Sequence, residues 1–131
     1  MSTAENKKLI QDAFAAWARG DGAAFFNLLA DDVRWTVIGS TPVSRTYTSK
    51  QEFLAGAAQP LTAKLAAPIV PSIRAVIAEG DLIVLQWDGR SSAKNGTIYY
   101  QTYCWVMRLE GGKVREATAY LDTALINQIW T

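Results

Sequence analysis

The chain changes from a helical to a β-strand pattern part-way along, and this change limits the folds open to it. Residues 3–19 place apolar side chains at helical spacing, as an amphipathic helix does. Beyond that point, four segments rich in β-branched and aromatic residues predict strands: residues 69–78, 82–90, 97–109 and 113–121. Short connectors containing glycine separate these segments, so we expect an antiparallel meander.

The region between the first helix and the meander predicts three further elements. A short second helix is expected to be capped by Asp21 and to end at Asp31 and Asp32, and residues 33–38 favour a strand. This helix would hold the apolar residues Phe25, Phe26, Leu28 and Leu29. A third helix is expected to start after Ser49 and to be interrupted by Pro60. A short helix then closes the chain around residues 125–129. Helices segregated from a largely antiparallel sheet define the α+β class, with the helices covering one face of the sheet.

Length and charge restrict the organisation and the partners. A chain of 131 residues predicts one domain over residues 1–131. Thirteen basic residues against twelve acidic ones leave a net charge of +1, so we expect neither a nucleic-acid nor a membrane partner. The chain also lacks the apolar run of a signal peptide or a membrane span, which predicts a cytoplasmic location.

The absence of histidine removes whole classes of chemistry. No histidine occurs, which excludes Ser-His-Asp and Cys-His catalysis as well as zinc sites that use histidine. The single cysteine, Cys104, cannot form a disulfide within the chain. The glycine pairs read as turns, without the strand-to-helix pattern of a phosphate-binding loop. We therefore expect no metal and no nucleotide cofactor.

Three groups of motifs, spread over nearly the whole chain, carry a likeness to a known family. They are Asp32-Val-Arg-Trp35 with Gly39 and Tyr47–Phe53; Glu79-Gly80-Asp81 with Val84 and Trp87; and Tyr100–Arg108 with Gly112–Glu116 and Tyr120–Thr123. In this order they resemble SnoaL-like and ketosteroid-isomerase-like proteins of the nuclear transport factor 2-like superfamily. The superfamily includes cyclases, isomerases, epoxide hydrolases, dehydratases and members that only bind ligands, so the fold alone does not select a function.

The resemblance implies a particular architecture. A cone-shaped, curved, mixed or antiparallel sheet would wrap around the N-terminal helices, as in the cystatin-like roll, and enclose an apolar cavity. It also implies a homodimer formed through the outer face of the sheet. The expected partner inside the cavity is a small apolar molecule.

Asp122 permits two interpretations. It precedes Thr-Ala-Leu-Ile and so can cap the closing helix, which contributes about 1 kcal/mol. Alternatively, Glu116, Thr118, Tyr120 and Asp122 share one strand parity, so Tyr120 and Asp122 can both point into the cavity. In the cyclases that the chain resembles, the matching aspartate is an acid/base. An apolar cavity would raise its pKa toward neutrality, as proton transfer at neutral pH requires.

Other candidate site residues lie on the strands and helices around the expected cavity. The resemblance points Tyr103 and Gln101 inward, where a phenol and an amide can hydrogen-bond a carbonyl or enolate oxygen. Packing within the sheet is the alternative for Tyr103, and an interface is the alternative for Gln101. Aromatic side chains are expected to surround a flat hydrophobic ligand, although each alone also suits an ordinary core: Trp17, Trp35, Phe53 and Trp87.

Two functions follow from these candidates. The first is a cofactor-free cyclase, isomerase or dehydratase, in which Asp122 moves a proton and Tyr103 stabilises the oxyanion. The second is a ligand-binding or accessory domain without chemistry, in which Asp122 is only a cap. The loop after the first strand, residues 36–40, lacks the aspartate that ketosteroid isomerases carry there, which argues against their route of proton abstraction.

Overall fold

Helix α1, Thr3–Ala18, is the first element of the computed structural model, which describes the whole chain. A capping box starts it. Ser2 Oγ accepts a hydrogen bond from the Glu5 amide at 3.1 Å, and Glu5 Oε1 accepts one from the Ser2 amide at 3.0 Å. Its apolar stripe is buried at Ile10 and Phe14. The amphipathic helix expected at this end of the chain is therefore confirmed.

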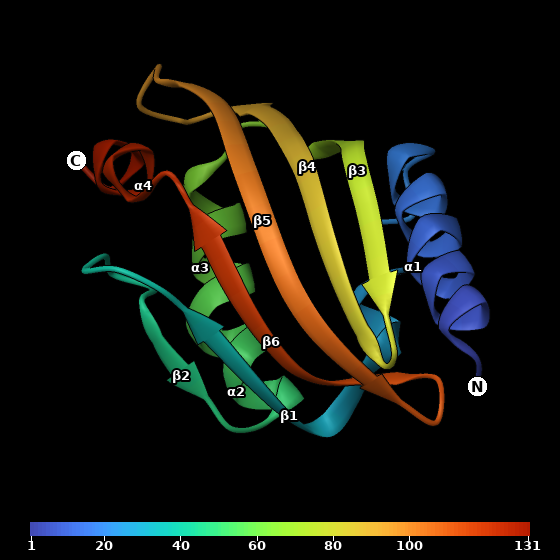
Figure 1. Ribbon diagram of the computed structural model, residues 1–131. Coiled ribbons are helices and arrows are strands. Elements are labelled where there is room, and N and C mark those ends of the chain that lie inside the picture. Colours follow the sequence, from blue (N-terminus) through green and yellow to red (C-terminus); the bar gives the residue numbers. More distant parts are fainter.

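Six strands form one curved sheet in the order β2-β1-β6-β5-β4-β3 (Figure 1). Their bounds are β1 Leu29–Val37, β2 Arg45–Tyr47, β3 Val70–Glu79, β4 Leu82–Ser92, β5 Ile98–Glu110 and β6 Lys113–Leu121. Strands β3 to β6 pair antiparallel in chain order, as the sequence predicts, whereas β1 pairs parallel with β6. The curved, mixed sheet of an α+β fold is confirmed.

The region expected to be a second helix forms no α-helix. Only a single 3₁₀ turn forms, Phe26–Leu28, and β1 already begins at Leu29. Leu29 pairs with Val114 of β6 and is buried, so tertiary pairing outweighs the local helical pattern. The prediction of a second helix between Asp21 and Asp31 is therefore wrong.

A continuous helical segment follows β2 and lies against the inner face of the sheet (Figure 1). It consists of α2, Lys50–Phe53, a π-helical segment, Leu54–Ala58, and α3, Gln59–Lys64. The interruption expected at Pro60 does not occur. Pro60 stands in the first turn of α3, where a residue without an N–H is tolerated.

The sheet and helices enclose one cluster of 28 buried hydrophobic residues. Along β5 the inward side chains alternate with outward ones, so Tyr103, Trp105 and Met107 are buried while Tyr100 is exposed. Helix α4, Thr123–Ile129, follows β6 and closes one end of the structure. None of the helices is both long and apolar enough to cross a lipid bilayer.

Candidate functional site

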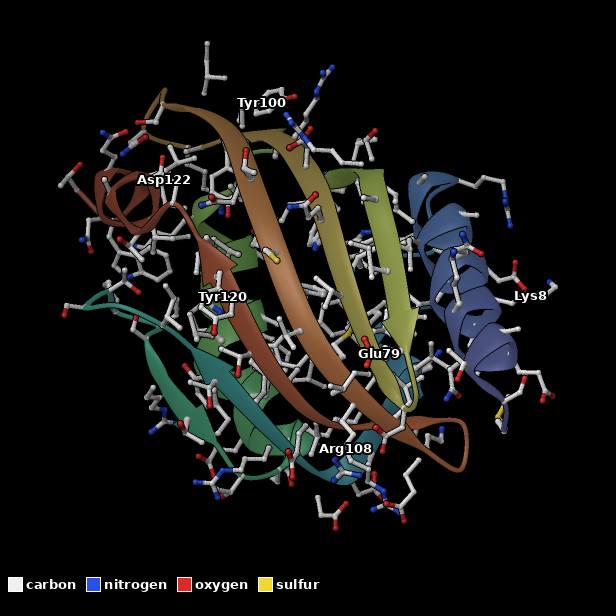
Figure 2. All side chains as sticks on the ribbon, in the orientation of Figure 1. Lys8, Glu79, Tyr100, Arg108, Tyr120 and Asp122 are labelled. Carbon is white, nitrogen blue, oxygen red and sulfur yellow. The ribbon has the colours of Figure 1, made fainter.

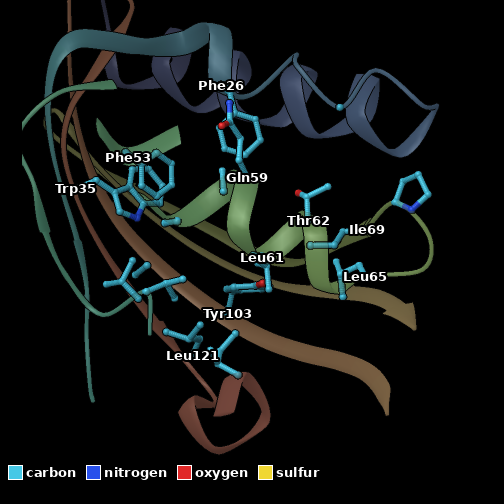
Figure 3. Close-up of a pocket in the computed structure, with 18 of the residues that line it drawn as sticks. Phe26, Trp35, Phe53, Gln59, Leu61, Thr62, Leu65, Ile69, Tyr103 and Leu121 are labelled. Carbon is cyan, nitrogen blue, oxygen red and sulfur yellow. The ribbon is translucent and has the colours of Figure 1, made fainter. Parts of the chain in front are cut away.

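A cavity of about 580 Å³ lies between the inner face of the sheet and the helical segment α2–α3 (Figure 3). Of the 23 residues that line it, 19 are hydrophobic. The strands contribute large aromatic side chains, the helical segment contributes small ones such as Ala57 and Ala58, and Ile126 of α4 borders the far end. A volume of this size matches the pockets that hold drug-sized molecules.

Two pairs of stacked rings form part of the cavity wall. Trp35 and Phe53 stack with centroids 4.5 Å apart, and Trp87 and Tyr103 stack at 4.2 Å with an interplanar angle of 11°. Trp105 contacts both pairs edge-on, with its centroid 4.9 Å from Trp35 and from Trp87. Because each ring rests on another, the wall is fixed in position and presents flat apolar surfaces to the cavity.

The structure brings the four aromatic residues singled out in the sequence to this cavity: Trp17, Trp35, Phe53 and Trp87. They come from four elements. Trp17 lies in the last turn of α1, Phe53 ends α2, and the other two lie on the inner face of β1 and β4. Elements far apart in the sequence therefore converge on one hollow.

Tyr103 also lines the cavity, and its hydroxyl lies 2.6 Å from that of Tyr99. Burial raises the pKa of Tyr99 to about 12 and holds the pKa of Tyr103 well above its ordinary value. Both phenols are therefore neutral at neutral pH. Tyr103 can donate a hydrogen bond to a ligand, but it cannot serve as a base there.

Asp122 does not face the cavity. Its side chain is exposed, and its carboxylate caps α4 by accepting a hydrogen bond from the Leu125 amide at 3.3 Å. The parity argument for β6 was right about which residues share a face and wrong about the direction. The small side chains of Ala117 and Ala119 take the inner face, with Leu121 after them.

The expected position of Tyr120 was wrong for the same reason as that of Asp122. It is 46% exposed and projects from the outer face of β6, on the side of the sheet away from α2 and α3 (Figure 2). Tyr120 therefore does not line the cavity as the sequence led us to expect.

Gln101 is fully buried, but its amide is already satisfied by backbone groups. Its Nε2 donates to the Asp122 carbonyl at 3.0 Å, and its Oε1 accepts from the amides of Asp122 at 2.7 Å and Thr102 at 3.1 Å. These bonds extend the β5–β6 ladder beyond its last pair, Tyr103 with Leu121. Gln101 thus holds the junction between β6 and α4, and it is not among the residues that line the cavity.

The comparison with protein families agrees with this geometry. Residues 10–117 match the SnoaL-like domain family. This chain belongs to the SnoaL-like family. SnoaL-like proteins bind small molecules, and many catalyse isomerisation or cyclisation. No curated protein matches the sequence.

Solved structures of similar proteins share the fold over the whole chain. An NTF2-like protein of unknown function from Burkholderia pseudomallei is 25% identical with a TM-score of 0.81, covering 100% of this chain and 99% of that one. An NTF2-like protein from Burkholderia thailandensis is 22% identical with a TM-score of 0.80, covering 96% and 97%. TerC, co-crystallised with polyporic acid, is 19% identical with a TM-score of 0.75, covering 96% and 98%.

The cavity of this SnoaL-like protein carries no ionised side chain. No aspartate, glutamate, lysine or arginine borders it, and Tyr103 is its only titratable group. No group of three or more potential metal-ligating side chains comes together anywhere in the structure. The arrangement can enclose a neutral molecule and donate hydrogen bonds to it, but it offers neither a base nor a counter-ion.

Sequence reasoning missed several residues of the wall, among them Trp105, Phe26 and Leu61. Trp105 follows Tyr103 by two positions and so shares its strand face, a signal that was present in the sequence. Leu61 was missed because the helix was expected to break at Pro60.

Proposed function

We propose that this SnoaL-like protein binds a small, neutral, largely apolar molecule in the cavity. The observation that carries the proposal is the lining itself, with 19 hydrophobic residues of 23 and no ionised side chain. Burial of an apolar surface against such a wall is favourable by about 25 cal/mol for each Å² removed from water. A charged ligand would lose its hydration without gaining a partner, so the site selects against it.

Two similar structures support the binding of small organic molecules by this fold. TerC was co-crystallised with polyporic acid, and a protein with a ketosteroid isomerase-like fold from Catenulispora acidiphila was solved in complex with trimethylamine. These ligands were observed in those two proteins and not in the present one. They support the idea that this fold holds small organic molecules, and the lining of the present cavity supports a neutral one.

The experiment that tests binding blocks the cavity from within. Ala119 is buried on the inner face of β6 and lines the cavity, whereas its neighbour Thr118 projects from the opposite face. We expect the wild type to bind the neutral dye Nile red with enhanced fluorescence, Ala119→Phe to lose this binding, and Thr118→Phe to keep it. Circular dichroism establishes that both variants are folded. Equal binding by the two variants would contradict a ligand site inside the sheet.

A second candidate function is catalysis next to a carbonyl group. The phenol pair of Tyr99 and Tyr103 favours it, because a protonated phenol at the cavity wall can stabilise negative charge developing on an oxygen. Asp122 has no part in this candidate, and the wall provides no base in its place. Binding without chemistry is therefore the first proposal.

Deuterium uptake separates these two functions. A ketone that is found to bind the wild type is incubated with it in D₂O, and mass spectrometry follows exchange of the protons beside its carbonyl. Catalysis predicts exchange that Tyr103→Phe slows by at least about tenfold. Absence of exchange in the presence of the wild type removes the catalytic candidate and leaves binding intact.

We further propose a homodimer formed through the outer face of the sheet. Large apolar side chains are exposed there: Val70, Ile77, Leu82, Ile98, Tyr100 and Tyr120. Apolar groups gathered on one face of a sheet mark interaction surfaces. In sedimentation velocity we expect a dimer for the wild type, a monomer for Ile77→Glu, and an unchanged dimer for Gln11→Glu on α1. A wild type that sediments as a monomer at every concentration would overturn this proposal.

A further inference from the structure

The π-helical segment beside the cavity follows from one missing backbone donor. In an α-helix, the carbonyl of residue 56 would accept a hydrogen bond from the amide of residue 60. Residue 60 is proline, which has no N–H and whose ring crowds the carbonyl four residues earlier. The helix widens to a π-helix over Leu54–Ala58, just before this proline. The Gly56 carbonyl therefore needs a donor from outside the helix.

Tyr47 of β2 supplies that donor. Its side chain is only 1% exposed, and its hydroxyl donates to the carbonyl oxygens of Val43 at 2.7 Å and of Gly56 at 3.1 Å. A phenol has one proton, so the two acceptors share it. One hydroxyl group thus joins the loop between β1 and β2 to the π-helical segment.

Tyr47 does not itself line the cavity, but it holds residues that do. Val43 lines the cavity, and so does Ala57, the residue after Gly56. The Tyr47 ring packs edge-on against Phe53 with centroids 5.7 Å apart, and Figure 3 shows Phe53 in the cavity wall. These three wall residues lie outside the strands, so the hydrogen bonds of the sheet do not fix their positions.

The helix approaches Tyr47 so closely that residue 56 has no room for a side chain. A Cβ atom at residue 56 would lie 2.6 Å from Cε1 of Tyr47 and 3.0 Å from Nη2 of Arg45. The guanidinium group of Arg45 lies over the Tyr47 ring, 4.5 Å from its centroid. Glycine therefore permits the contact with Tyr47 that Pro60 makes necessary.

We propose that Tyr47 is a positioning residue of the ligand site. Its hydroxyl fixes the loop between β1 and β2 and the π-helical segment relative to each other, and so sets the shape of the wall that a ligand meets. This inference rests on the proposed binding function. A wall that is held in place before binding spares the ligand the cost of ordering it. Short π-helical segments are rare and are frequently found at functional sites, which agrees with this role.

The Tyr47→Phe variant tests the role by removing one oxygen atom. Nile red is expected to bind about three- to tenfold more weakly than to the wild type, because two carbonyls of the wall lose their donor. Gln101→Leu is the matched control, since it also removes side-chain bonds to backbone groups but lies outside the wall, and it should bind as the wild type does. Equal affinities of Tyr47→Phe and the wild type would overturn the inference.

A second substitution tests the link through Gly56. Pro60→Ala restores an N–H four residues after Gly56, so the carbonyl gains a donor within the helix. Pro60 is not one of the residues that line the cavity. The loss of affinity caused by Tyr47→Phe should therefore be at least about twofold smaller in the Pro60→Ala background. A loss of the same size in both backgrounds would overturn the assignment to the π-helical segment.

Hydrogen exchange distinguishes positioning from a general loss of stability. In Tyr47→Phe, the amides of residues 41–44 and 54–59 should be accelerated by a larger factor than those of β5. Equal factors would mean that only global stability has changed, which would overturn the positioning role. The proposed function fails separately. A wild type that does not bind Nile red overturns that function, whereas wild-type binding that Tyr47→Phe leaves unchanged overturns only this inference.

Discussion

The two faces of the sheet have the same strands but opposite chemistry. On the inner face of β5, Tyr103, Trp105 and Met107 are buried, and no ionised side chain accompanies them. On the outer face of the same strand, Arg108 forms ion pairs with Glu110 and Glu116 at 3.2 Å each. Charge has thus been kept out of the hollow and concentrated on the opposite side, which suits a cavity for neutral molecules.

The outer face also shows what a buried carboxylate requires in this fold. Asp88 is only 6% exposed, and it accepts hydrogen bonds from Arg74 Nε at 2.8 Å and from the Tyr100 hydroxyl at 3.1 Å. The hydrogen bond from Arg74 holds the pKa of Asp88 below its ordinary value. The cavity wall on the inner face contains no arginine or lysine, so a carboxylate placed there would lack a cationic partner such as Arg74.

The largest effect is therefore expected from a charge moved to the inner face. Leu85 is fully buried on the inner side of β4, and the next residue, Gln86, is exposed on the outer side. Leu85→Glu should lower the free energy of unfolding by about 3–5 kcal/mol, whereas Gln86→Glu should change it by less than about 0.5 kcal/mol. Urea unfolding measures both. Similar losses in the two variants would contradict the difference between the faces.

A neutral polar side chain on the inner face should matter through its hydrogen bonds. Gln101→Leu leaves the amide and the carbonyl of Asp122 without their partner, which should lower the free energy of unfolding by about 1–3 kcal/mol. The exposed Asn127→Leu on α4 is the control and should stay within about 0.5 kcal/mol. Urea unfolding again gives the comparison. An unchanged free energy of unfolding in Gln101→Leu would mean that these bonds do not hold the β6–α4 junction.

The cap at the start of α4 should contribute less. Asp122→Ala removes the acceptor of the Leu125 amide and should cost about 1 kcal/mol, whereas Asp122→Asn retains a good cap and should be nearly neutral. Thermal unfolding distinguishes the two. Binding of Nile red should be unchanged in both variants. A large loss of binding in Asp122→Asn would restore a role for this carboxylate in the site.

The meander could be predicted from the sequence because its signals are local. The expected strand over residues 113–121 coincides with β6, and the other three agree within about two residues at each end. Alternating side chains and glycine turns fix such strands without reference to the rest of the chain. Strand β2, Arg45–Tyr47, gave no such signal, because three residues are too few to show a period.

The site was harder to predict because it depends on the face of the sheet toward which each side chain points. Parity identified Tyr120 and Asp122 as neighbours on one face, but parity alone does not say which face is the inner one. That is decided by the whole of β6, where Ala117 and Ala119 are buried and Ala119 lines the cavity. The aromatic wall was found because large rings in a small domain are rarely left in water, whichever element carries them.

The smallest effect at neutral pH, and the one most specific to the inner face, concerns the phenol pair. Burial raises the pKa of Tyr99 to about 12 and that of Tyr103 well above its ordinary value, whereas an unfolded chain ionises its tyrosines near pH 10. A raised folded pKa contributes stability that is fully present below about pH 10 and is lost as the pH rises toward about 12.

Urea midpoints measured across this window should fall more steeply for the wild type than for Tyr103→Phe, which has one buried phenol fewer to ionise. Tyr120→Phe on the outer face should follow the wild type, because its ring is largely in solvent. If Tyr120→Phe flattened the alkaline loss as much as Tyr103→Phe does, the two faces would not differ in the way their burial predicts.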